Sequence, residues 1–120
     1  MSMQYFFNLH DLTQGIGRQL AEGMETRIFP GDNVMISVVR IAPGMAGEIH
    51  DHPEEQWGVL LEGSGVRVHD GRDHHVKAGD FWRTPGGVPH GFRAGPEWAV
   101  VLDIFSPPRE EYRKAGQGFH

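Results

Sequence analysis

The sequence predicts an all-β fold, a sandwich or barrel of short strands, and two observations support this prediction. Segments rich in Val, Ile and aromatic residues recur along the chain, and Gly- and Pro-rich turns separate them at roughly eight- to twelve-residue intervals. With 17 glycines and 8 prolines among 120 residues, the chain has enough turn formers for that spacing. A chain of this length is expected to form one domain, residues 1–120, whose barrel core covers about 24–106.

The sequence gives little evidence for structure in its first twenty residues. Residues 1–20 have little hydrophobic pattern, and Gly15-Ile16-Gly17 is expected to be a turn, because no βαβ unit surrounds it as a nucleotide-binding loop would require. The first strand is expected at 26–29 and ends in a Pro-Gly-Asp-Asn turn. A stronger strand, rich in Val and Ile, covers 34–42 until Pro43-Gly44 stops it.

The later strands follow at short spacing. They are expected at 56–61, 66–69, 74–77, 81–84, 90–93 and 98–105. The dipeptide Asp70-Gly71 is typical of a type I′ hairpin turn between two of them. After Pro107-Pro108, residues 109–115 are expected to make one or two helical turns, and residues 116–120 a loose tail.

Composition excludes several classes of function. The formal net charge of −5 and the absence of a basic stripe argue against nucleic acid as a partner, because such binding depends on Lys and Arg neutralising phosphates. The chain has no cysteine, which excludes disulfides, thiolate ligands and cysteine nucleophiles. No signal-peptide pattern or long apolar run is present, so a cytoplasmic protein without a membrane partner is expected.

Two histidines and a glutamine in one stretch are candidate metal ligands. His50, His52 and Gln56 share parity, so in an extended strand their side chains face the same side. Imidazole nitrogens suit borderline divalent metals, and an amide oxygen can serve as a further ligand. His90 follows a Pro-Gly turn, and an antiparallel hairpin can bring it back beside the first pair. Four such ligands leave open positions on a five- or six-coordinate metal, as a reactive centre requires.

These two stretches resemble the paired motifs of the cupin superfamily. The first motif corresponds to Gly44, His50, His52, Gln56 and Gly63, and the second to Gly79, Pro85, Gly87 and His90. The resemblance implies a small double-stranded β-helix, or jelly-roll, barrel that forms a homodimer and holds one divalent ion, Zn, Ni, Fe or Mn, inside its mouth. Two positions depart from the usual pattern, since Gln56 stands where most cupins have Glu and Ala94 where many have Asn.

A narrower resemblance covers residues 24–112. The stretches His-x-His-Pro-x-Glu-Gln, Pro-His-Gly and Val-Leu-Asp-Ile-Phe-Ser-Pro-Pro-Arg-Glu are similar to the small single-domain cupins of pectin and alginate breakdown. Those enzymes open the ring of 4,5-unsaturated monouronates to give a linear keto-deoxy acid, and a glutamine ligand is normal among them. The resemblance therefore implies a small sugar acid as substrate and assigns catalytic roles to Asp103, Phe105 and Arg109.

The residues themselves leave those three roles open. Asp103 is a lone carboxylate in an apolar strand, and buried carboxylates are rare unless they are functional or bonded to a neighbouring strand or turn. Arg109 could grip a uronate carboxylate with two hydrogen bonds, or could cap the end of the sheet at the surface. Phe105 fits a core position as well as a pocket.

The remaining histidines are expected to play no part in the metal site. His69, His74 and His75 flank a hairpin turn and should form a solvated edge, whereas His10 and His120 lie near the ends of the sequence. Two other functions remain open, because one fold hosts many chemistries. The first is another metal cupin enzyme, a dioxygenase or a lyase, and the second is a sugar-binding or sensing protein without turnover.

Overall fold

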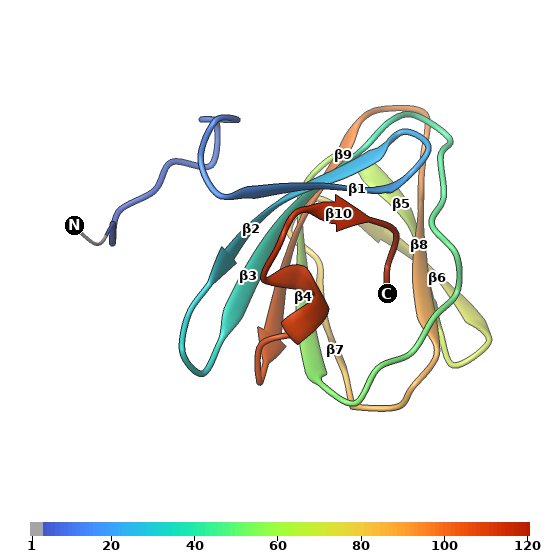
Figure 1. Cartoon of the computed structure of the whole chain (residues 1–120). Helices are drawn as coiled ribbons and strands as arrows, with labels where there is room; N and C mark the ends of the chain where they lie inside the picture. The colour runs from blue at the N-terminus through green and yellow to red at the C-terminus, as the bar shows by residue number, and fades with distance from the viewer. Residues whose placement is uncertain (1–3) are drawn as a thin grey trace.

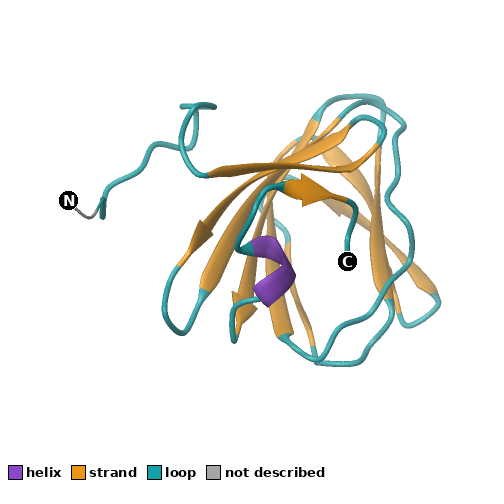
Figure 2. Cartoon of the chain, viewed as in Figure 1, coloured by secondary structure: helices purple, strands orange, loops and turns teal. Residues whose placement is uncertain are grey.

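The structure is a computed structural model that describes residues 4–120, and it forms an all-β barrel of two sheets (Figure 1). Strands make up nearly all of its regular structure, and a single short helical turn lies near the C-terminal end of the described residues (Figure 2). The all-β prediction is confirmed. The elements are β1 Ile16–Ala21, β2 Met24–Pro30, β3 Met35–Ile41, β4 Glu55–Glu62, β5 Ser64–His69, β6 Arg72–Lys77, β7 Phe81–Thr84, β8 His90–Ala94, β9 Ala99–Ser106, η1 Glu110–Tyr112 and β10 Gly116–Gln117.

The strand order brings distant parts of the chain together. The larger sheet has the order β10-β1-β2-β3-β9-β4-β7, and the smaller sheet has the order β6-β5-β8. The late strand β9 lies between β3 and β4 and pairs antiparallel with both. In the β4–β9 register, Gln56 lies opposite Phe105, and Gly58 lies opposite Asp103. This pairing places the predicted catalytic strand directly beside the predicted metal-binding stretch.

The expected start of the barrel core near residue 24 is wrong, because β1 adds a strand that pairs antiparallel with β2. The sequence pattern hides this strand, since its inward-facing positions include Arg18, which is buried although it is charged. An arginine at an inward position breaks the apolar alternation that marks a strand. The turn expected at Gly15 is present, with φ of 78°, but Ile16 and Gly17 already belong to β1.

The expectation of a loose tail is also wrong. Gly116 and Gln117 form β10, which pairs parallel with β1, and Phe119 is only 8% exposed. Arg18 donates hydrogen bonds to the backbone carbonyls of Gln117, Gly118 and His120 at 2.8–2.9 Å. A side chain about a hundred positions earlier therefore orders this segment, and no local pattern could have revealed it. The predicted helical turn is present as η1, a single 3-10 turn.

The core lies between the two sheets. Its buried apolar members come from strands of both sheets and from the segment after β9, and they are Leu20, Met24, Ile28, Met35, Val39, Ile41, Leu60, Phe92, Ala94, Ala99, Val101, Phe105, Tyr112 and Phe119. Burial of these side chains is the main term that stabilises the barrel.

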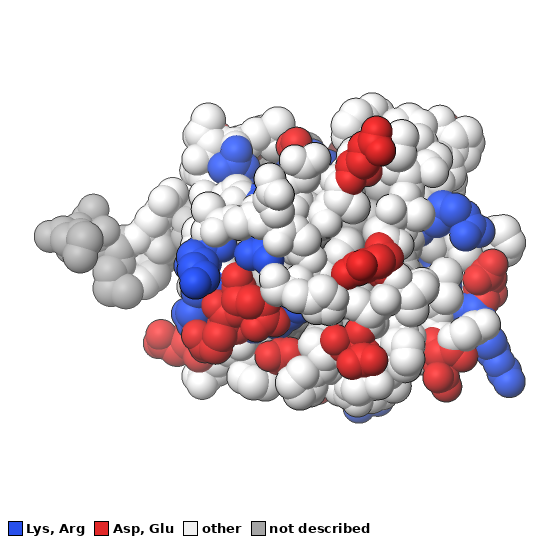
Figure 3. Space-filling model, turned by 45° about the vertical axis from the view of Figure 1, so that its right-hand side comes forward, with Lys and Arg blue, Asp and Glu red and all other residues white. Residues whose placement is uncertain are grey.

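The surface shows no single dominant charge. Acidic and basic side chains are interspersed on the face drawn in Figure 3. Trp57 and Trp98 are exposed in the isolated chain, at 41% and 58%. Residues 4–120 form no helix with the length and apolar character needed to cross a membrane.

Candidate metal centre

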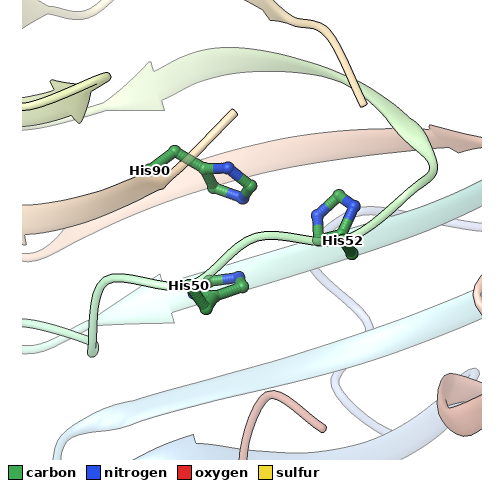
Figure 4. Close-up of side chains that lie close together, drawn as sticks. All are labelled: His50, His52 and His90. Atoms are coloured by element: carbon green, nitrogen blue, oxygen red, sulfur yellow. The ribbon is translucent and has the colours of Figure 1, made fainter. Parts of the chain in front are cut away.

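Three histidines converge inside the barrel (Figure 4). His50 and His52 come from the segment before β4, and His90 begins β8. His50 and His90 exchange two backbone hydrogen bonds, of 3.0 and 2.9 Å, which lock the two segments side by side. The possible ligand atoms of the three rings all lie within 4.8 Å of one another. The predicted return of His90 beside the first pair is therefore present in the fold.

The backbone orients each ring. The Nδ1 atom of every histidine in the cluster lies 2.8–3.0 Å from the carbonyl oxygen of a residue two positions away. A carbonyl only accepts, so each Nδ1 must carry the proton and donate. The lone pair is then left on Nε2, the arrangement in which a hydrogen-bonded imidazole binds a metal.

Burial keeps these rings neutral. Desolvation is the largest cause that lowers the pKa of His50 to about 4 and that of His90 to about 3. The positive charge of Arg109 adds to the lowering at His50, and Arg67 does the same at His90. The pKa of His52 is also lowered, chiefly by burial. Neutral imidazole is the form that binds a metal, so the rings are ready to act as ligands at neutral pH.

Gln56 lies against the cluster from β4. Its side chain is buried, and its Oε1 atom lies 2.9 Å from Nε2 of His52. With the His52 proton on Nδ1, two acceptors face each other, and such a contact is stable only if a cation lies between them or the amide presents its N–H₂ instead. The position fits the predicted fourth ligand, and that role stays a prediction.

The donor set fits one divalent cation. It consists of three neutral imidazoles and one amide, which suit borderline metals of the Zn, Ni, Fe and Mn group. The Nε2 atom of His90 is buried without a hydrogen-bond partner among residues 4–120, so it lacks the partner that a ligand atom would have in the loaded protein. His74 and His75 are exposed on β6, as expected of a solvated edge.

Asp103 faces this cluster from β9. It lines the same cavity as His50, His90 and Gln56, and within the described chain its Oδ1 atom is buried without a hydrogen-bond partner. Burial raises the pKa of the carboxyl to about 6, although Arg67, a hydrogen bond from Gln56 and Arg109 each oppose the rise. A carboxyl with such a pKa can both accept and release a proton near neutral pH.

Phe105 and Arg109 also line the cavity. Phe105 is buried, and its ring centroid lies 5.6 Å from that of His52. Arg109 is only 2% exposed, so the alternative of a surface cap is wrong. Its guanidinium is already hydrogen-bonded, to Glu111 Oε1 at 2.9 Å and to the carbonyl of Phe119, and it stacks over the Tyr112 ring at 4.1 Å.

Residues 116–120, which we call the mouth segment, cover the cavity, and β10 lies across the end of the barrel in Figure 1. The Phe119 ring packs on His50 with 4.4 Å between centroids. His120 was expected to be incidental, and its Nε2 atom lies 3.0 Å from Oε1 of Glu48. The cavity beneath has a volume of about 50 Å³, room for a few waters.

Sequence reasoning missed one charged residue of the cavity wall, Arg67 on β5. It alternates along the strand with Val66 and Val68, and a charged residue in such a pattern usually lies on the solvated face. The structure buries it instead, to 5% exposure. The alternation fits two orientations of this strand, and the one with Val66 and Val68 on the outer face places Arg67 inside.

Comparison with known proteins agrees with this geometry. The family model described as "Cupin domain" matches residues 37–105, more than half of the chain. Pectin degradation protein KdgF of Dickeya dadantii is 29% identical over 96 residues, which cover 78% of this chain and 87% of KdgF. An RmlC-like cupin from Shewanella frigidimarina has the same fold, with a TM-score of 0.79 and 25% identity over 92% of this chain and 96% of that one.

Two further relatives match with higher identity but over less of their length. Oxalate decarboxylase OxdC of Bacillus subtilis is 33% identical over 91 residues, 71% of this chain. Dimethylsulfoniopropionate lyase DddW of Ruegeria pomeroyi is 36% identical over 80 residues, 67% of this chain. The chain spans 24% of OxdC and 51% of DddW. The family match, the paired motifs and the barrel together show that the chain belongs to the cupin family.

Proposed function

We propose that this protein is a metal-dependent enzyme that opens the ring of a 4,5-unsaturated monouronate or a similar sugar acid and releases a linear keto-deoxy acid. One observation supports this most directly: Asp103 lines the same cavity as His50 and His90, two members of the three-histidine cluster. The similarity to KdgF, whose name places it in pectin degradation, extends over most of both chains.

The reaction is an isomerisation and needs no co-substrate. Loss of the proton from the C1 hydroxyl forms an aldehyde as the C1–O5 bond breaks, and the electron pair moves to O5 of the enol. Protonation of C4 then gives the 5-keto, 4-deoxy product. Asp103 is the group that accepts the first proton and delivers one to C4. A divalent metal, when bound by the histidines, would polarise a substrate oxygen as a Lewis acid.

Access to the site requires the mouth segment to move. A cavity of about 50 Å³ is several-fold smaller than the roughly 300 Å³ or more of a small-molecule pocket, so a sugar ring does not fit beneath Phe119. The segment is held by hydrogen bonds from Arg18 and Arg109 to backbone carbonyls, by the pairing of β10 with β1 and by burial of Phe119. Its displacement would open the His50 side of the cavity to the substrate.

A second candidate is a metal cupin enzyme that acts on a smaller carboxylic acid. The small volume beneath the mouth segment favours it, and so does the similarity to OxdC and DddW, the names of which are those of a decarboxylase and a lyase. A sugar-acid-binding protein without turnover is the non-enzymatic alternative.

The deciding experiment is an absorbance assay. Purified protein loaded with Zn, Ni, Fe or Mn is mixed with unsaturated monouronates prepared from pectin and from alginate, and the band of the conjugated double bond is followed. The proposal expects loss of the band with the wild type and little loss with Asp103→Asn. If neither substrate reacts with any of the metals, the ring-opening proposal is wrong, and decarboxylation of small acids becomes the next assay.

We also propose that the protein forms a homodimer through the outer face of the larger sheet. Apolar side chains on β3, β9 and β4 lie in register there, with Ile36 beside Ile104 and Ile104 beside Trp57. The next row places Leu102 beside Val59. Trp57 is 41% exposed in the isolated chain, and burial of such a patch against a second copy would stabilise a dimer.

A further inference from the structure

The wall of the cavity includes a buried cation from β5. Arg67 is 5% exposed and lines the same cavity as Asp103 and His90. Its NH2 group donates a 2.9 Å hydrogen bond to Thr84 Oγ1, and its guanidinium lies 5.4 Å from the centroid of the Trp82 ring. Its Nε atom is buried and finds no hydrogen-bond partner among residues 4–120. One N–H of a charged group is thus left unsatisfied.

This charge also forms no direct ion pair, although the carboxyl of Asp103 is close enough to interact with it electrostatically. None of the ion pairs formed within the described chain includes Arg67, although a buried guanidinium normally has a carboxylate or another anion as its partner. Arg109 differs, because Glu111 and the carbonyl of Phe119 already occupy its N–H groups. Of the two arginines in the cavity, Arg67 is the one with donor capacity left for a ligand.

Two further polar atoms near Arg67 are unsatisfied within residues 4–120. Trp82 Nε1 and Asp103 Oδ1 are both buried without a hydrogen bond in the described part of the chain. Both lie close to the position that a Cβ of Gly58 would occupy, which is 3.0 Å from the carboxylate oxygen. An unused N–H donor of Arg67 and an unused acceptor of Asp103 therefore line one cavity.

A hydroxy acid has the groups that this wall lacks. Its carboxylate can accept a hydrogen bond from the Nε–H group of Arg67, and its hydroxyl can donate to Asp103. Burial makes such a charge-assisted bond stronger than the same bond in water. A neutral sugar offers no charged acceptor to this N–H group, and a buried donor left unsatisfied costs free energy.

We propose that Arg67 binds the carboxylate of the substrate and so makes the site specific for hydroxy acids over neutral sugars. The inference rests on the proposed function for the identity of the acid, a monouronate. It differs from the expectation that came with the family resemblance, in which Arg109 holds the acid group. In this chain Arg109 holds the mouth segment, and Arg67 is the specificity residue.

The test measures binding of a saturated monouronate, which has no double bond and cannot be ring-opened. Galacturonate and galactose differ in the carboxylate, so calorimetry on the metal-loaded protein should show preference for galacturonate. Arg67→Gln should weaken galacturonate binding by about tenfold or more and leave galactose binding unchanged. Arg67→Lys, which keeps the charge, should recover part of the loss. Arg83→Gln is the matched control, because Arg83 is exposed and pairs with Glu55 at 2.6 Å.

If the Arg67 variants do not fold, a fluorescence measurement on the protein with Arg67 intact still tests the proposal. Galacturonate binding should change the fluorescence of Trp82, and the change should be absent in Trp82→Phe, whereas galactose should give none. The proposal is overturned if folded Arg67→Gln binds galacturonate as the wild type does, or if the wild type shows no preference and no Trp82 signal. Failure of the absorbance assay with intact galacturonate binding would instead count against ring opening alone.

Discussion

The rings of His50 and Phe119 pack against each other with 4.4 Å between their centroids, so a segment that pairs with β1 covers the three-histidine cluster. The contact places an apolar side chain, which has no ionisable or metal-binding group, against a candidate metal ligand. Phe119 also closes the cavity over Asp103 and Arg109. Access to the cluster and stability of the mouth segment are therefore coupled, and variants can separate them.

Phe119→Ala should open the mouth of the cavity. Because less apolar contact then has to be broken for a substrate to enter, we expect a lower KM with a similar kcat for an unsaturated monouronate. The free energy of unfolding should fall by about 2–4 kcal/mol, because a buried aromatic ring is lost. Steady-state kinetics and urea denaturation measure the two effects. Phe81→Ala, at an exposed phenylalanine of β7, should change neither; an unchanged KM in Phe119→Ala would show that the ring does not control access.

His90→Gln should abolish tight binding of a divalent metal. The Nε2 atom of His90 is buried beside His50 and His52, and an amide is a much weaker ligand than imidazole. Elemental analysis after dialysis and competition with a chromogenic chelator measure the loss, expected at 100-fold or more, roughly 3 kcal/mol. His75→Gln, an exposed histidine on β6, should retain the metal. Equal metal content in the two variants would contradict the assignment of the cluster.

Asp103→Asn should change the pH dependence of stability of the chelator-treated protein. The folded-state pKa of Asp103, about 6, lies above its ordinary value of 3.8, so this group favours the folded state fully below about pH 4. That contribution is lost as the pH rises through 6, at a cost on the order of 2–3 kcal/mol relative to low pH. Asparagine removes the loss, so the variant should gain stability over the wild type between pH 4 and 7.

Urea denaturation of both proteins at several pH values across this range tests the expectation. Asp51→Asn, an exposed aspartate in the loop beside the cluster, serves as the control and should follow the wild type. A constant difference between Asp103→Asn and the wild type at every pH would mean that the carboxyl does not titrate between 4 and 6.

Trp57→Glu should weaken the proposed dimer. The side chain lies in the apolar row with Ile104 and Ile36, and a carboxylate there would be buried against the second copy without a partner. Light scattering on a size-exclusion column should show the wild type as a dimer and the variant shifted to monomer, with the dissociation constant at least about tenfold higher. Trp98→Glu, at an exposed tryptophan before β9, should remain dimeric. A monomeric wild type would refute the proposal outright.

The part of the site that the sequence predicted is the part governed by strand parity and turn spacing. His50 and His52 are two positions apart, so an extended backbone had to turn both rings the same way. The Pro-Gly turn before His90 then limited how the next strand could return. Asp103 was singled out by a local contrast, since it is the one charge in an apolar strand.

The parts that were missed depend on contacts between distant residues. Arg18 stands at an inward position of β1 because its guanidinium bonds to carbonyls of the mouth segment, and nothing near it in sequence indicates that partner. Arg67 is inward for a similar reason, with its bond to Thr84 supplied by another sheet. The engagement of Arg109 by Phe119 could not be expected while residues 116–120 were thought to be loose.

Arg18 and Arg109 hold the mouth segment by its backbone carbonyls and not by its side chains. Every amino acid offers the same carbonyl, so these bonds place few demands on the side chains at positions 119 and 120. Glycine is needed at Gly116, where a Cβ would come within 2.9 Å of the Arg18 guanidinium, and at Gly118, where φ is 79°. The cover over the cavity could therefore be altered, during evolution or by design, at the last two positions while Arg18 and Arg109 keep the backbone of the segment in place.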